Sequence, residues 1–295
     1  MPPASRSPRR AAAATLARPP RSEAATAEFT MSEEEFRRIA ERVFRLCGIV
    51  LKAHKRQMVH TRIARRLRAL GLPSFTAYLD LLDSPAGARE LQQFANAVTT
   101  NLTSFFRESH HFDHLRERVL APRLAAGAAR VRIWSAGCST GEEPYSIAMA
   151  ALGRGGPAAD RPVDLRILAT DLDTDVLARA EAALYKAERA EDVPAALRAG
   201  SLLRRGDGQV EVAPALRRAV AFRRLNLLQD WPFSGPFDAI FCRNVLIYFD
   251  AETKASLVSR FAAMLAEDGA LYLGHSESLL GEHPQLVSEG RTIYR

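Results

Sequence analysis

One stretch, Val131–Ser146 (VRIWSAGCSTGEEPYS), constrains the fold more than any other part of the chain. It begins with an apolar run typical of a buried strand, passes through a turn with two glycines, and enters an apolar pattern of helical period. Pro144 suits the first turn of that helix, because its missing N–H leaves no hydrogen bond unmade there. A strand, a glycine turn and a helix in this order predict the first unit of a nucleotide-binding α/β sheet.

The residues of this turn argue against a phosphate ligand. A P-loop needs Gly-Lys-Ser/Thr, and the turn has no lysine. Glu142 and Glu143 stand at the helix start, where the phosphate of a dinucleotide would lie. Acids suit the helix dipole there and also favour a cationic ligand such as S-adenosylmethionine, which has a sulfonium and no phosphate. A glycine turn alone is equally typical of a plain tight connection, so both interpretations stay open at this point.

Length and cysteine content limit the class of protein. The 295 residues, 47% of them hydrophobic, suffice for one large domain or two smaller ones. The three cysteines, Cys47, Cys138 and Cys242, are far apart and fit neither a disulfide framework nor a zinc site. No apolar run approaches the ~18 residues of a membrane span, and the N-terminus has no long apolar segment of a secretion signal. We therefore expect a protein of the cytoplasm.

The chain before the first predicted strand divides into three parts. Residues 1–30, rich in Ala, Arg, Pro and Ser, predict a disordered tail. Residues 31–100 predict an all-helical domain: Ser32 and Glu35 fit a capping box, and three further helices follow with short connections. Residues 101–130 predict a linker helix that leads into an α/β domain over 131–295.

The second helix, over roughly His54–Leu70, has an unusual charge. Seven Lys/Arg and no acid lie between Lys52 and Arg68. Lys55, Arg62 and Arg66 fall within about 40° of arc on this helix. A solvated helix face explains the pattern as well as a surface for an acidic partner does. The net charge of the chain is +7, of which the first thirty residues contribute +3 (five arginines minus two acids), so the charge alone does not require nucleic acid.

The second strand of the α/β part, Leu165–Ala169, is followed by a candidate ligand-binding acid. Asp171 lies at its carboxyl end, where an acid can accept hydrogen bonds from ribose hydroxyls. The next helix can be capped by Asp173 or Thr174, which leaves Asp171 available. His275, after a later strand, is a candidate general base, although a structural histidine is at least as common there.

Residues 185–225 interrupt the alternation of strands and helices. Asp207-Gly208 is a strong hairpin signal. Two candidate strands, Gln209–Val212 and Val220–Arg224, predict a small β insertion, which is a plausible docking site. The fold class we expect from these patterns is a Rossmann-like sheet of α/β type with a small β insertion, preceded by an all-helical domain.

Five ordered segments carry a resemblance to a known family, the chemotaxis receptor methyltransferases (CheR). From about Phe29 to the C-terminus the chain resembles this family. The matching segments are TTNLTSFFRESHHF (99–112), WSAGCSTGEEPYSIAM (134–149), ATDLDTDVL (169–177), GPFDAIFCRNVLIYFD (235–250) and GHSESL (274–279).

The resemblance implies a function and a set of site residues. The function is S-adenosylmethionine-dependent methylation of glutamate side chains on the cytoplasmic domain of chemoreceptors, giving methyl esters and S-adenosylhomocysteine. Tyr248 would lie near the transferred methyl group and, with Arg107, orient the reactants. Lys55, Arg62, Arg65 and Arg66 would meet the acidic receptor. The implied cofactor-binding residues are Asn101, Thr103, Arg107, Gly137, Glu142 (amino group), Asp171 (ribose), Asn226, Leu227, Arg243 and Asn244.

The implied chemistry needs little acid–base help. A glutamate with a pKa of about 4.3 is ionised at neutral pH and can attack a sulfonium methyl without a general base. The enzyme then chiefly positions the reactants and excludes water, so neither a catalytic triad nor a metal is required. In this family the β insertion can bind a receptor's C-terminal peptide. For this chain the sequence does not decide whether the insertion does so.

Two rival functions remain. A nucleic-acid methyltransferase would use the basic helix against phosphates. Against it, the fourth strand ends in Cys242-Arg243-Asn244-Val245 and not in the Asn/Asp-Pro-Pro-aromatic sequence of amino-group methylases. A cofactor-sensing scaffold without catalysis is the other rival. We expect a monomer that contacts the membrane only through its receptor and binds no nucleic acid.

Overall fold

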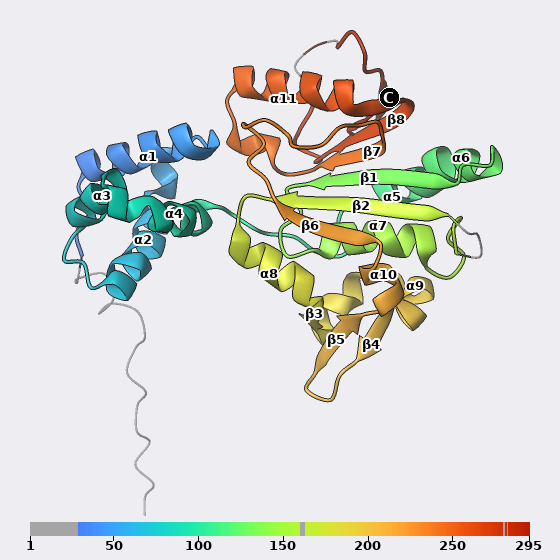
Figure 1. The fold of residues 1–295 in the computed structure, drawn as a ribbon, viewed down its shortest axis with the longest axis horizontal. Coiled ribbons are helices and arrows are strands. Elements are labelled where there is room, and N and C mark those ends of the chain that lie inside the picture. The colour runs from blue at the N-terminus through green and yellow to red at the C-terminus, as the bar shows by residue number, and fades with distance from the viewer. Residues whose placement is uncertain (1–28, 160–162, 280, 282) are drawn as a thin grey trace, which may run out of the picture.

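The computed structural model describes residues 29–159, 163–279, 281 and 283–295, so the predicted tail of residues 1–30 lies outside them except for its last two. The described chain forms a helical lobe and an α/β lobe, joined by a segment without regular structure (Figure 1). Within these residues, no helix is both long and apolar enough to cross a membrane.

Four helices form the first lobe, and local sequence signals set their ends. They are α1 (Glu33–Cys47), α2 (Arg56–Leu70), α3 (Phe75–Asp83) and α4 (Glu90–Val98), with 3-10 turns at Ala53–Lys55 and Pro85–Arg89. Ser32 and Glu35 form the capping box at the start of α1. Gly71, in the left-handed conformation, ends α2. The apolar faces of the helices enclose their own core, which includes Ile39, Ile63 and Phe94.

The second lobe is built around a seven-stranded sheet of order β6-β2-β1-β7-β8-β10-β9. Strands β6, β2, β1, β7 and β8 are parallel, and β10 and β9 are antiparallel. The strands are β1 (Arg130–Ala136), β2 (Asp164–Asp171), β6 (Val220–Arg224), β7 (Phe237–Cys242), β8 (Leu265–Leu273), β9 (Ser288–Gly290) and β10 (Ile293–Tyr294). This arrangement confirms the predicted Rossmann-like fold class.

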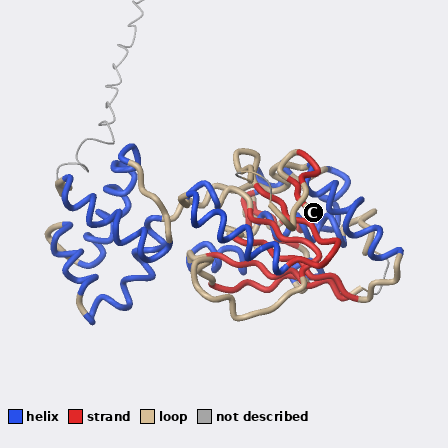
Figure 2. Tube along the Cα trace, turned by 90° about the horizontal axis from the view of Figure 1, so that it is seen from above, coloured by secondary structure: helices blue, strands red, loops and turns tan. Residues whose placement is uncertain are grey.

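Helices cover both faces of this sheet (Figure 2). Successive residues of β1 point to opposite faces, so Ile133 joins one hydrophobic core and Trp134 the other. The helices of the lobe are α5 (His110–His114), a π-helical turn (Leu115–Leu120), α6 (Ala121–Ala125), α7 (Glu142–Leu152), α8 (Thr174–Ala182), α9 (Ala195–Ser201), α10 (Pro214–Arg217) and α11 (Ala251–Met264), with 3-10 turns at Ala187–Asp192 and Leu246–Tyr248. The core with Ile133 includes α5 and α7, and the core with Trp134 includes α11.

The β insertion is smaller than the sequence predicted. A three-stranded antiparallel sheet, β3-β5-β4, consists of β3 (Leu184–Lys186), β4 (Leu202–Arg204) and β5 (Gln209–Val212). The predicted assignment of Val220–Arg224 to the insertion is wrong, because this strand is β6 and pairs in parallel with β2. It buries only Phe222 since it lies at the edge of the main sheet, and a short, mostly exposed strand resembles part of a small hairpin.

The order of the strands reverses around β1. Strand β2 lies on one side of β1 and β7 on the other. In open parallel sheets, ligands bind outside the carboxyl ends of the strands at such a reversal. The chain segments after β1, β2 and β7 are therefore the ones that build the site.

Candidate functional site

A cavity of about 260 Å³ lies where these segments meet the helical lobe. Its wall comes from six stretches of chain that are far apart in sequence. They are residues 47–49, 99–107, 137–143, 170–172, 225–227 and 243–249. The cavity thus lies at the reversal point of the sheet and is closed on one side by the end of α1.

The glycine turn after β1 fits closely under a neighbouring loop. Gly137 has φ +85°, and a Cβ there would lie 2.4 Å from Cγ2 of Val245. The N–H groups of Gly137 and Cys138 both donate to the carbonyl oxygen of Thr170, at 2.8 and 2.9 Å. Only glycine meets both the backbone conformation and the close approach, so the turn is fixed as a rigid wall of the cavity.

Asp171, at the end of β2, is a buried acceptor on the cavity wall. Its Oδ2 accepts from the N–H of Ser139 at 2.8 Å and its Oδ1 from that of Asp173 at 3.0 Å. Burial raises the pKa of Asp171 to about 6 against the opposing effect of these N–H donors. Asp173 caps α8, so Asp171 is not used as the cap. Each Asp171 oxygen keeps acceptor capacity for ligand hydroxyl groups.

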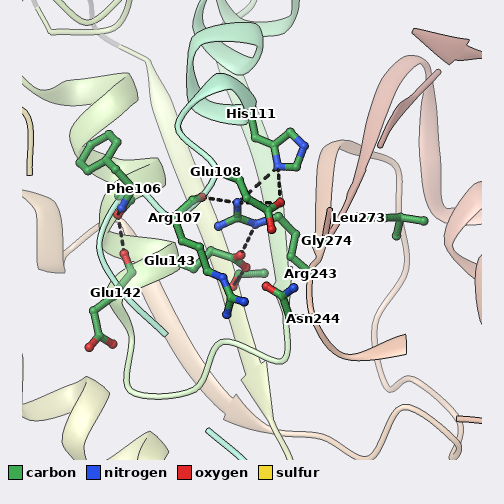
Figure 3. A network of polar contacts seen from close by, with 12 residues as sticks. Phe106, Arg107, Glu108, His111, Glu142, Glu143, Arg243, Asn244, Leu273 and Gly274 are labelled. Atoms are coloured by element: carbon green, nitrogen blue, oxygen red, sulfur yellow. Dashed lines mark hydrogen bonds and ion pairs between the residues drawn. The ribbon is translucent and has the colours of Figure 1, made fainter. Parts of the chain in front are cut away.

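The two acids at the start of α7 have different environments. Glu142 does not line the cavity; it accepts from Oγ1 of Thr140 and pairs with Arg189 at 3.0 Å. Glu143 lines the cavity, and Figure 3 shows it directed toward Arg243 while Glu142 points away. Consecutive helical residues point about 100° apart, so only one can face the cavity, and the sequence does not say which.

Arg243 is the centre of a buried polar cluster behind the cavity (Figure 3). Its Nε donates to Oε2 of Glu143 at 2.7 Å, and its Nη1 donates to the carbonyl oxygen of Arg107. The same Nη1 lies 3.3 Å from Nδ1 of His111, whose pKa is lowered to about 4, chiefly by burial. The guanidinium also lies over the ring of Phe112. Arg243 lines the cavity, and the bonds of its Nε and Nη1 within the protein hold this part of the wall in place.

The loop after β7 is held by a buried glutamate that the sequence analysis did not single out. Glu277 accepts three backbone N–H groups, those of Asn244, Gly274 and Ile247, at 2.6, 2.7 and 3.0 Å. Asn244 has φ +59°, a conformation in which asparagine is one of the better-tolerated residues. Glu277 lies within the family-like GHSESL segment, which was the available signal.

Two further predicted site residues, Tyr248 and Arg107, also line the cavity. The Tyr248 hydroxyl lies 3.4 Å from the carbonyl oxygen of Thr100, and burial raises its pKa, so the phenol is neutral at physiological pH. The positive charges of Arg107 and Arg62 act on this phenol in the opposite direction. Among the described residues Arg107 has no carboxylate partner; its Nη1 donates to the carbonyl oxygen of Leu102.

The remaining predicted cofactor residues also lie on the cavity wall: Asn101, Thr103, Asn226 and Leu227. Two of them also tie parts of the protein together. The Asn226 amide donates to the carbonyl oxygen of Leu46 in α1 at 2.8 Å. The Asn101 amide donates to Oδ2 of Asp173 at 2.7 Å. The position of the helical lobe and the shape of the cavity are therefore coupled.

The basic side chains of α2 make more contacts within the protein than the sequence suggests. Arg62 donates to the carbonyl oxygens of Ala97 and Thr99, and Arg66 makes two 2.8 Å bonds to Glu90. Both arginines are therefore tied to other parts of the helical lobe, and their contact with a receptor stays a prediction. Arg65 is exposed and Lys55 is half-buried, and neither has an ion-pair partner in the described part of the chain. None of these four residues lines the cavity.

The histidine considered as a general base lies elsewhere. His275 is exposed and does not line the cavity. Its Nδ1 lies 3.0 Å from Oε1 of Glu108. This pair joins the loop after β8 to the segment that carries Arg107, so the position of His275 offers no route to a substrate proton.

Comparisons with known proteins agree with this geometry. The model "CheR methyltransferase, all-alpha domain" matches residues 34–99, and "CheR methyltransferase, SAM binding domain" matches residues 101–294. Chemotaxis protein methyltransferase 2 of Pseudomonas aeruginosa is 45% identical over 271 residues, covering 90% of this chain and 94% of the relative. Chemotaxis protein methyltransferase of Escherichia coli is 43% identical over 277 residues, covering 91% and 93%.

Proposed function

Because the chain belongs to the CheR methyltransferase family and takes S-adenosylmethionine as its cofactor, we propose that it methylates glutamate side chains on the cytoplasmic domains of chemoreceptors. The products are glutamate methyl esters and S-adenosylhomocysteine. The process served is adaptation in chemotaxis or a related signalling pathway. We further propose that the enzyme acts as a cytoplasmic monomer and reaches the membrane only through its receptor.

The observation that carries this proposal is the pair formed by Arg107 and Tyr248 in the cavity. A guanidinium without an acidic partner beside a neutral phenol suits a carboxylate, since both groups donate hydrogen bonds and one is cationic. Arg62, whose charge also acts on Tyr248, adds to the positive field there. A base such as adenine or cytosine has no negative charge to match this field.

The cavity also fits the cofactor. The two carboxylate oxygens of Asp171 suit ribose hydroxyls. Gly137 has no side chain, so the turn packs closely against Val245 and nothing at this position blocks a ligand. Asn101, Thr103, Asn226, Leu227 and Asn244 would line the adenine and methionine ends. The resemblance assigns the amino group to Glu142; Glu143, which lines the cavity, already accepts from Nε of Arg243 and from Oγ of Ser135. When bound, S-adenosylmethionine supplies a methyl group on a sulfonium centre.

The residues of the chain then have simple tasks. A substrate glutamate is already ionised, so no side chain has to remove a proton. Tyr248, kept protonated by burial, donates a hydrogen bond to one carboxylate oxygen and leaves the other free to react. Arg107 orients the carboxylate groups that lie near the methionine part of the cofactor. The wall around them excludes water, which strengthens these interactions.

Replacing Tyr248 by phenylalanine is expected to lower kcat about tenfold, the effect of about 1.4 kcal/mol of lost transition-state stabilisation. The phenol acts on the acceptor carboxylate, so the dissociation constant of S-adenosylmethionine should not change. Steady-state methylation of a receptor fragment and calorimetric titration of the cofactor measure the two effects. Mass spectrometry of the product should place the added methyl group on glutamate side chains. Methylation confined to lysine or arginine side chains would refute the proposal.

The receptor surface is expected to include the part of α2 that faces solvent and the 3-10 turn that precedes α2. The change Lys55→Glu with Arg65→Glu should raise KM for the receptor fragment roughly tenfold at low salt, and less at high salt, because exposed charges are screened. The control Arg118→Glu with Arg218→Glu makes the same charge change on exposed residues outside α2. If the control raises KM as much as the α2 variant does, net charge and not this surface is responsible.

A further inference from the structure

Two aliphatic side chains at the cavity are poorly covered by the protein. Leu102 is 78% exposed and Ile247 is 45% exposed, and both line the cavity. Leu102 lies in the segment that leads from α4 to α5, and Ile247 lies in the 3-10 turn Leu246–Tyr248 after β7. They are far apart in the sequence and line the same cavity.

The backbones of both residues are nevertheless held firmly. The carbonyl oxygen of Leu102 accepts from Nη1 of Arg107 at 3.1 Å. The N–H of Ile247 donates to the buried carboxylate of Glu277 at 3.0 Å. A leucine on a mobile surface loop would need no such support. Here Arg107 and Glu277, which bond to other parts of the cavity wall, also hold the backbones that carry the exposed side chains of Leu102 and Ile247.

Further apolar surface adjoins them. Val50 and Leu228, 42% and 38% exposed, are chain neighbours of the lining residues Ile49 and Leu227. The N–H of Val50 donates to the carbonyl oxygen of Tyr248 at 2.8 Å, which places this segment beside the catalytic tyrosine. Of the nine exposed large hydrophobic residues in the described part of the chain, four therefore line the cavity or follow a lining residue directly. Grouping of this kind marks an interaction site.

The charge around this surface indicates what covers it. Arg107 lies in the cavity without an acidic partner among the described residues, and Arg65 of α2 and Lys55, in the turn before α2, add positive charge on the helical lobe. A covering segment must therefore be acidic overall and yet present aliphatic side chains next to its acceptor carboxylate. An amphipathic helix meets both conditions, because residues three and four positions away lie on the same face.

We propose that Leu102 and Ile247 form an apolar clamp that reads the aliphatic residues flanking the acceptor glutamate on an acidic helical segment of the receptor. The inference rests on the proposed function and adds its specificity determinants. The clamp contacts the residues three or four positions before and after the glutamate. The glutamate itself enters between the two side chains toward Tyr248.

The test uses the full chain and a helical receptor fragment. Leu102→Ala and Ile247→Ala are each expected to raise KM for the fragment about tenfold, with kcat and the cofactor's dissociation constant unchanged. Val287→Ala, which truncates a comparably exposed residue outside the cavity, is the matched control and should leave KM unchanged. The thermal midpoint of each variant shows whether it folds normally.

A second arm changes the substrate. Serine in place of the aliphatic residues three and four positions from the acceptor glutamate should raise KM for the wild-type enzyme. The same substitutions should have little further effect on the Leu102→Ala, Ile247→Ala double variant, since contacting groups are non-additive. Additive losses, or an unchanged KM for the enzyme variants, would overturn the clamp. If the wild-type enzyme forms no methyl ester on the fragment at all, the proposed function itself fails, which is a different outcome.

Discussion

Asparagine in place of Asp171 is expected to weaken the binding of S-adenosylmethionine about 100-fold, or about 2.7 kcal/mol. The carboxylate accepts from two backbone N–H groups and retains capacity for two ligand hydroxyls. Asparagine replaces one of its oxygens with an NH₂ group, so one ribose hydroxyl loses its acceptor and one backbone N–H faces another donor. Isothermal titration of the cofactor measures the effect. An affinity within threefold of wild type would show that Asp171 does not hold the ribose.

The same residue gives the binding a characteristic pH dependence. The pKa of Asp171 is raised to about 6, first by burial and further by the charge of Asp173. The carboxylate is therefore ionised above this pH and protonated below it. Because the ionised form accepts the ribose hydroxyls, wild-type affinity should fall as the pH drops from 7 to 5. The Asp171→Asn variant should bind weakly with a flatter profile. Asp207→Asn, an exposed aspartate in the insertion, is the control.

Methionine in place of Arg243 is expected to destabilise the protein by about 3–5 kcal/mol. Methionine keeps the packing against Phe112 but leaves the carboxylate of Glu143 buried without its ion-pair partner. The carbonyl oxygen of Arg107 loses its donor as well. Urea denaturation measures the change in the free energy of unfolding.

A second substitution tests the cause of that loss. Adding Glu143→Gln to Arg243→Met removes the unpaired charge and should recover a substantial part of the stability. The single Glu143→Gln variant, measured alongside, completes the cycle. A double variant no more stable than Arg243→Met would show that the buried charge is not the source of the instability.

The elements that the sequence predicts well are those that depend on near neighbours in the chain. The capping box at Ser32, the glycine turn at Gly137 and the helix that follows it are all specified within a few residues. The position of Asp171 follows from strand order, because carboxyl ends of parallel strands meet at one edge of the sheet. The family resemblance then supplied Tyr248, Asn226 and Asn244, for which spacing alone gives no reason.

The features that the sequence does not reveal depend on partners far away in the sequence. Arg66 bonds to Glu90 and Arg62 bonds to backbone carbonyls after α4, contacts that a charge pattern within one helix cannot reveal. The choice between Glu142 and Glu143 depends on the rotation of α7, which is set by packing. Strand β6 lies at the edge of the main sheet and pairs with β2. A short edge strand has the same sequence pattern as a strand of a small insertion, so the sequence alone does not distinguish the two.

The most direct test of the account follows a labelled methyl group. Purified protein is incubated with methyl-labelled S-adenosylmethionine and a chemoreceptor cytoplasmic fragment. A parallel reaction contains RNA in place of the fragment. The pH of both product mixtures is then raised. Carboxyl methyl esters hydrolyse in base to volatile methanol, whereas N-methyl groups remain attached. We predict volatile label from the receptor reaction alone. Base-stable label on RNA, or on receptor side chains other than glutamate, would contradict the account.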